Sequence, residues 1–120
     1  MASHEKFTWH KIADHRSELE WNAQGFAECM VAGKKVCVSV YKDNLFGCAT
    51  KCPHAGGNMA AGYVDALGNL VCPLHRYKFS LQNGRNTSGE GYFLKTYPVE
   101  EREDGIYVGF RENNPFSFFK

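Results

Sequence analysis

Two short stretches, Cys52-Pro53-His54 and Cys72-Pro73-Leu74-His75, decide the fold and the chemistry of this chain. Each stretch combines one thiol with one imidazole, and seventeen residues separate them. Soft thiolates and imidazoles in such tight pairs indicate a metal site. A mononuclear zinc site usually separates its cysteine pair from its histidine pair, whereas here each pair contains one of each. A zinc site with the same four ligands is the alternative.

The mixed pairing suits a [2Fe–2S] cluster, because each loop can give a thiolate to one iron and an imidazole to the other. Histidines replace two cysteines on one iron in clusters of raised reduction potential. We therefore expect Cys52, His54, Cys72 and His75 to bind one such cluster per chain.

Composition narrows the class of protein. The 120 residues are 43% hydrophobic and 14% aromatic, which suits a single domain over residues 1–120 with one core. The chain has fourteen Lys and Arg and thirteen Asp and Glu, so it lacks the excess of positive charge that attracts nucleic acid. No apolar run approaches the roughly 18 residues of a membrane span, and Met1–Lys6 lacks the apolar segment of a signal peptide. Five cysteines, an odd number, suggest reduced thiols. We expect a cytoplasmic protein.

Turn residues recur every eight to twelve positions, a spacing typical of an all-β sandwich or barrel. The alternation of valines with other residues over 35–41 is the strongest strand pattern, and Asp104-Gly105 indicates a tight hairpin. We also expect one helical turn within 14–21, capped by Asp14. The expected strands are 7–12, 35–41, 45–50, 70–71, 77–81, 94–102 and 106–110. Each ligand pair then follows a short strand, on two loops that a rigid sheet can hold side by side.

The ligand spacing resembles the Rieske [2Fe–2S] domain family, most closely the soluble Rieske-type ferredoxins of bacterial oxygenase systems. The resemblance covers about 7–110 and leaves an aromatic tail at 111–120. Supporting features are Pro53, Pro73, Gly56-Gly57, Gly89–Gly91 as a third, cluster-covering loop, and Tyr97-Pro98-Val99 as its strand. The resemblance implies an antiparallel β-sandwich with a small cluster-binding subdomain formed by two loops.

Departures from the family's high-potential members concern the surroundings of the cluster. Gly57 and Leu74 stand where those members carry a disulfide between the two loops. Tyr77 and Phe79 stand where they carry a serine and a tyrosine that donate hydrogen bonds to the cluster. With fewer donors, we expect a potential at the low end of the Rieske range. Arg76 stands where much of the family has glycine; it is either strained by a positive φ or contributes charge beside the cluster.

The resemblance implies an electron-transfer protein and not an enzyme. The chain would carry one electron from a flavin-dependent reductase to an oxygenase or another redox enzyme. The alternative is a small Rieske-like subunit of an assimilatory nitrite reductase or a similar multi-subunit oxidoreductase. Phe116, Phe118 and Phe119 in the tail would fold back onto the sheet or, alternatively, contact a partner.

Overall fold

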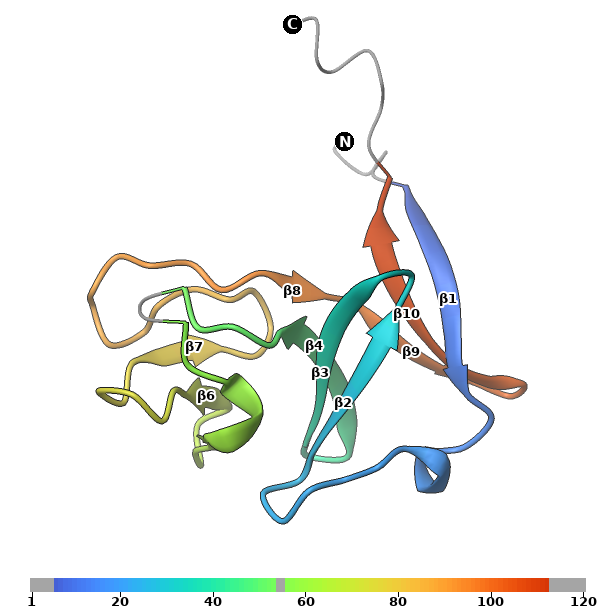
Figure 1. Ribbon diagram of the computed structural model, residues 1–120, viewed down its shortest axis with the longest axis horizontal. Helices are drawn as coiled ribbons and strands as arrows, with labels where there is room; N and C mark the ends of the chain where they lie inside the picture. Colours follow the sequence, from blue (N-terminus) through green and yellow to red (C-terminus); the bar gives the residue numbers. More distant parts are fainter. Residues whose placement is uncertain (1–5, 54–55, 113–120) are drawn as a thin grey trace, which may run out of the picture.

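The computed structural model describes residues 6–53 and 56–112, which form three antiparallel sheets (Figure 1). The expected all-β fold is confirmed. The first sheet has the order β1-β10-β9, with β1 Phe7–Ala13, β10 Gly105–Arg111 and β9 Val99–Arg102. The second has the order β2-β3-β4-β8, with β2 Phe26–Val31, β3 Lys34–Tyr41, β4 Asn44–Ala49 and β8 Thr96–Tyr97. The third has the order β5-β6-β7, with β5 Tyr63–Val64, β6 Asn69–Val71 and β7 Lys78–Ser80.

Strand β3 is buried on both faces because it lies between two hydrophobic cores. Its Val36 and Val38 join Ile106 and Val108 in the core between the first and second sheets. Its Cys37 faces the opposite side and belongs to the core beneath the third sheet. The valine alternation predicted the strand correctly, and the second layer explains why the residues between the valines are buried too.

The segment between β4 and β8 contains the third sheet and both predicted ligand loops. It lies to one side of the sandwich, away from β1, β9 and β10 (Figure 1). A short 3₁₀ helix, η2 Met59–Ala61, packs into it, and the Asn58 side chain caps that helix by accepting from the Ala60 amide. The expected cluster-binding subdomain thus corresponds to a compact insertion between two strands of the second sheet.

Two details of the expected elements are wrong. The continuous strand expected at 94–102 divides at Pro98 into β8 and β9, which belong to different sheets. Proline has no amide hydrogen for a ladder, and the Pro98 carbonyl instead accepts from the Gly109 amide at 2.9 Å. The helical turn forms as η1 Arg16–Glu18, but His15 precedes it, and Asp14 pairs with Lys11 at 2.6 Å instead of capping it.

Strands β2 and β5 were missed by the sequence patterns. In β2, Phe26 packs into one core and Ala27 and Val31 into the other, so its burial does not alternate. Strand β5 has only two residues. Within residues 6–53 and 56–112, no helix has the length and apolar character needed to cross a membrane. The aromatic tail lies outside the described residues, apart from Arg111 and Glu112.

Candidate metal centre

The first ligand loop follows β4 and is closed by its own backbone. The Cys52 amide donates to the Gly57 carbonyl at 2.7 Å, and the Gly56 amide donates to the Cys52 carbonyl at 2.9 Å. Gly56 has a φ of +73°, a conformation that favours glycine. The Met59 amide then returns the chain to the Thr50 carbonyl at 2.7 Å. These bonds fix Cys52 at the entrance of a tight turn.

The second loop follows β6 and is closed in a similar way. The Cys72 amide donates to the Tyr77 carbonyl at 2.8 Å, so that β7 turns back to pair with β6. His75 and Arg76 make this turn with φ values of +62° and +57°. Of the two alternatives for Arg76, the positive φ is therefore the one found. Its side chain is also exposed, so a contribution of charge at the surface is compatible with this backbone.

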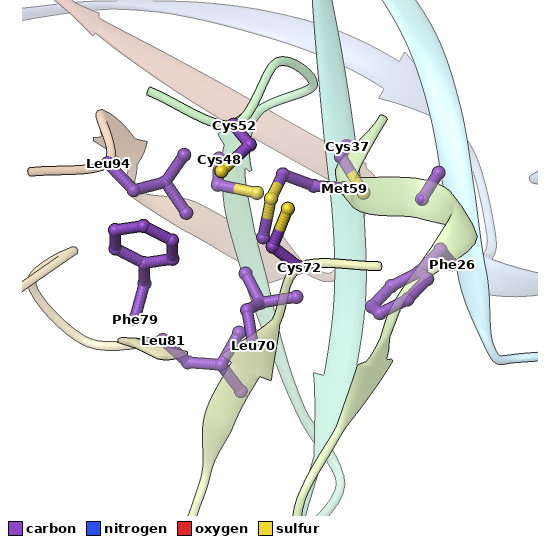
Figure 2. Close-up of a cluster of buried hydrophobic side chains, with 11 residues drawn as sticks. Phe26, Cys37, Cys48, Cys52, Met59, Leu70, Cys72, Phe79, Leu81 and Leu94 are labelled. Carbon is purple, nitrogen blue, oxygen red and sulfur yellow. The ribbon is translucent and has the colours of Figure 1, made fainter. Parts of the chain in front are cut away.

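The two cysteine side chains meet in the interior. Cys52 and Cys72 are both buried, and their sulfurs lie above Leu70 with Met59 beside them (Figure 2). Burial, and after it a hydrogen bond with the Cys52 thiol, raise the pKa of Cys72 to about 11, although the Leu74 amide opposes them by donating to the Cys72 sulfur. A bound metal cation would offset the cost of ionising the buried thiol, because a metal-coordinating thiol is deprotonated outright.

The histidine of the second loop lies at the surface. His75 is exposed, in contrast to the buried cysteines, and its ring centroid is 6.2 Å from that of Tyr77. The structure thus places Cys52, Cys72 and His75 on adjoining loops. His54 lies outside the described residues.

The donor set fits a binuclear cluster better than a mononuclear zinc ion. Zinc would draw three or four ligands to one point. Here each loop contributes one cysteine and one histidine, and the two cysteines are buried together while His75 is exposed. Each iron of a Rieske cluster needs only two protein ligands, so paired cysteines apart from the histidine are the arrangement expected.

Gly57 and Leu74 touch across the two loops. A Cβ atom on Gly57 would lie 3.0 Å from Cγ and Cδ1 of Leu74 and 3.4 Å from the Cys72 sulfur. The Leu74 side chain therefore occupies the space beside Gly57, and no disulfide can join these positions. Van der Waals contact connects the loops here.

Aromatic and aliphatic side chains enclose the sulfur pair from below. Phe79 is fully buried beside Leu70, Leu81 and Leu94 (Figure 2). It has no polar hydrogen to offer. Tyr77 packs against the core and stacks on Tyr92, with ring centroids 5.8 Å apart.

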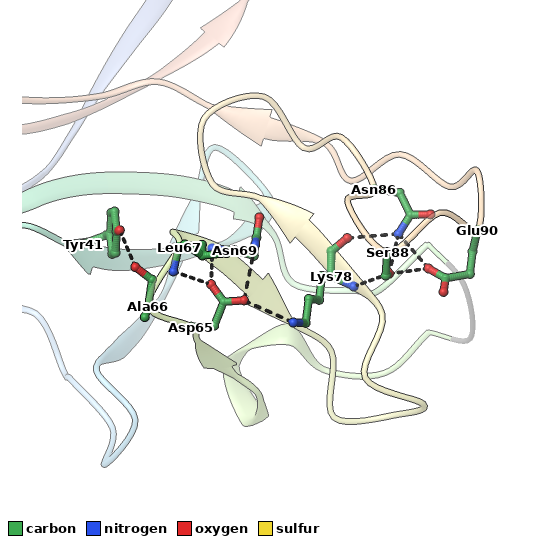
Figure 3. A network of polar contacts seen from close by, with 9 residues as sticks. All are labelled: Tyr41, Asp65, Ala66, Leu67, Asn69, Lys78, Asn86, Ser88 and Glu90. Atoms are coloured by element: carbon green, nitrogen blue, oxygen red, sulfur yellow. Dashed lines mark hydrogen bonds and ion pairs between the residues drawn. The ribbon is translucent and has the colours of Figure 1, made fainter.

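Asn86 organises the third loop, and the sequence patterns missed it. Its side-chain amide donates to the Lys78 carbonyl at 3.0 Å and to a Glu90 carboxylate oxygen at 2.9 Å (Figure 3). Its carbonyl oxygen accepts from the Gly91 amide at 2.7 Å. Ser88 also bonds to Glu90. The glycines at 89 and 91 signalled a loop, but nothing local indicated which side chain would close it.

These features are those expected of an iron–sulfur protein with two candidate ligand loops on an antiparallel β-sandwich. The Rieske [2Fe–2S] domain model matches residues 8–98, which is most of the chain. The chain therefore belongs to the Rieske [2Fe–2S] domain family, and its cofactor is a [2Fe–2S] cluster of the Rieske type.

Relatives in sequence include ferredoxin subunits of dioxygenase systems. The 3-phenylpropionate/cinnamic acid dioxygenase ferredoxin subunit of Photorhabdus laumondii is 30% identical over 69 residues, or 57% of this chain and 66% of that protein. The chain thus spans just under two thirds of that relative's length.

Solved structures confirm the fold. The ferredoxin of carbazole 1,9a-dioxygenase from Nocardioides aromaticivorans IC177 has a TM-score of 0.70 at 23% identity, covering 84% of this chain and 96% of that one. A chain described as an NADH-dependent nitrite reductase small subunit from Mycobacterium tuberculosis has a TM-score of 0.74 at 19% identity, covering 90% and 99%.

Proposed function

We propose that the chain is a one-electron carrier in which Cys52 and Cys72 hold one iron of the cluster, and His54 and His75 the other. The observation that carries this proposal is the buried sulfur pair at the start of two backbone-closed loops, with His75 exposed beside it. In this role the chain performs no substrate chemistry of its own.

The bound cluster would supply a single electron at a time. The protein's part is to exclude water from the sulfurs, and Leu70, Met59 and Phe79 in the core around them contribute to this. The Leu74 amide donates to the Cys72 sulfur and would stabilise negative charge there. Exposed His75 would bring the other iron to the surface, where an electron can pass to a partner.

The expected donor is a flavin-dependent reductase and the expected acceptor is an oxygenase. Support comes from the relatives, which are ferredoxins of dioxygenase systems.

A low reduction potential belongs to the same proposal. Phe79 cannot donate a hydrogen bond, and Leu74 contacts Gly57 where high-potential members are bridged. We expect a midpoint toward the lower part of the range of about −150 to +300 mV; a value above about +100 mV would contradict this.

A second candidate function is that of a small subunit in a nitrite reductase or similar assembly. The observation in its favour is the structural likeness to the mycobacterial small subunit. Size-exclusion chromatography with a candidate large subunit separates the two roles. A stable stoichiometric complex supports the subunit, whereas transient association with retained electron transfer supports the carrier.

Cluster content tests the ligand assignment. We expect two irons and two sulfides per chain, the absorption of an oxidised [2Fe–2S] cluster, and loss of both in Cys72→Ser. Cys29→Ser is the matched control, because Cys29 lies half-buried in β2 on the other core. A colourless protein that carries one zinc per chain would refute the proposal.

A further inference from the structure

Charge is unevenly distributed between the two ends of the molecule. The cluster-binding segment, residues 50–95, contains five Lys and Arg against only two carboxylates. The rest of the described chain contains eight Lys and Arg against ten carboxylates. The overall charge of +1 conceals this difference. Because the segment lies to one side of the sandwich (Figure 1), the difference is a separation of charge in space.

Two of the cations stand next to proposed ligands. Lys51 directly precedes Cys52, and Arg76 directly follows His75. Both are exposed. Within the described part of the chain, neither forms a salt bridge or donates a side-chain hydrogen bond. Their charges are therefore directed to solvent at the ligand loops.

The two carboxylates of the segment leave three of its five positive charges unbalanced. Asp65 pairs with Lys78 at 3.5 Å, so that these two charges offset each other. Glu90 accepts hydrogen bonds from Asn86 and Ser88 in the third loop (Figure 3). One-electron reduction of the cluster would change its charge by one unit, which is smaller than the remaining excess of positive charge.

Exposed apolar side chains accompany the cations. Leu74 is 43% exposed and touches both ligand loops, while Tyr92 on the third loop is 39% exposed and packs against Tyr77 beside His75. An apolar centre with charge at its edge is the usual composition of a transient protein interface.

We infer that the redox partner docks on this segment through an acidic face that surrounds an apolar centre. The inference rests on the proposed carrier function and adds the chemistry of the partner. Opposite charges on the two faces would steer the encounter and orient His75 toward the partner, because electrostatic complementarity acts mainly on association rate and orientation.

Two inorganic oxidants of opposite charge test the sign of the field at the cluster without any partner. The reduced holoprotein is mixed in a stopped-flow instrument with ferricyanide, an anion, or with tris(1,10-phenanthroline)cobalt(III), a cation. The ionic strength is raised from about 10 to about 500 mM, which shortens the screening length from about 30 Å to a few ångströms. We expect the ferricyanide rate to fall and the cobalt rate to rise. The opposite pair of trends, or two flat profiles, would overturn the inference while leaving the carrier function intact.

Two matched charge-reversal variants test whether the positive charge that acts on the oxidant lies at the ligand loops. Lys51→Glu should slow ferricyanide oxidation by about tenfold at low ionic strength, since a change of two charges acts on a trivalent ion at close range. Lys35→Glu makes the same change at an exposed lysine of β3, opposite Met30 in β2, and should alter the rate by less than about twofold. Equal effects of the two variants would refute a local positive docking face. Unchanged absorption spectra serve as the check that both variants retain the cluster.

Discussion

The contact between Gly57 and Leu74 makes a quantitative prediction about the two ligand loops. A Cβ on Gly57 would lie 3.0 Å from Leu74 Cγ. One further carbon–carbon bond of about 1.5 Å then places the two Cβ atoms at most about 4.5 Å apart, inside the range of about 3.5–4.5 Å that a disulfide requires. The φ of Gly57 is not in the left-handed region, so a cysteine can adopt this backbone. The double variant Gly57→Cys/Leu74→Cys should therefore form a disulfide on mild oxidation.

The expected stabilisation follows from the length of the closed loop. A disulfide that closes about 18 residues removes roughly 3 kcal/mol of unfolded-state entropy. Loss of the Leu74 side chain, which is already 43% exposed, costs about 1 kcal/mol of apolar burial. The net gain of about 2 kcal/mol should raise the thermal midpoint by roughly 10 °C.

Mass spectrometry and thermal denaturation of the metal-free and cluster-bound protein provide the assay. The oxidised variant should lose two hydrogens in mass, and adding a thiol reductant should reverse the rise in midpoint. The double variant Gly57→Ser/Leu74→Ser is the control, because it has similar volume and polarity but cannot form a bridge. If both introduced thiols stay free under oxidising conditions, the two positions are not adjacent and the arrangement of the loops described above is wrong.

Other variants test separate parts of the structure. Arg76→Gly should stabilise the fold by about 0.5 kcal/mol in urea unfolding, because relief of a left-handed φ outweighs the added chain entropy; Arg76→Val should destabilise it by 1 kcal/mol or more. Leu70→Ala should cost about 2–5 kcal/mol and accelerate bleaching of the cluster, since it opens a cavity beneath the sulfurs; an unchanged bleaching rate would argue against that packing. Asn86→Ala should speed hydrogen exchange of third-loop amides while leaving β10 unaffected, and uniform acceleration would contradict a local role. A hydrogen bond from Arg16 lowers the pKa of Glu101 in the folded protein. The stability that this pair contributes is therefore complete above the pKa of Glu101 in the unfolded chain and is lost as pH falls through its folded-state pKa. The thermal midpoint of Glu101→Gln should lose this part of its dependence on acid pH, and a pH profile identical to that of the unchanged protein would count against the pair.

The candidate site could be proposed from the sequence because its signals are local, and the assignment of its four ligands stays a prediction. Cys72 and His75 fall within four consecutive residues, and a turn of that length keeps both side chains in one place whatever surrounds it. The motif did not predict that His75 would be exposed and Cys72 buried. They result from the core that Leu70, Phe79 and Leu94 build around one side of the loop.

The sequence by itself determined the candidate ligand residues, the central strand β3 and the hairpin between β9 and β10, because residue chemistry, alternation and turn preferences act over a few neighbouring positions. Only the tertiary structure decided that the chain changes sheets at Pro98, that Cys37 faces a second core, and that Leu74 fills the space beside Gly57. Each of these depends on contacts between segments distant along the chain. Burial and close approach are properties of such contacts, so no local pattern could specify them.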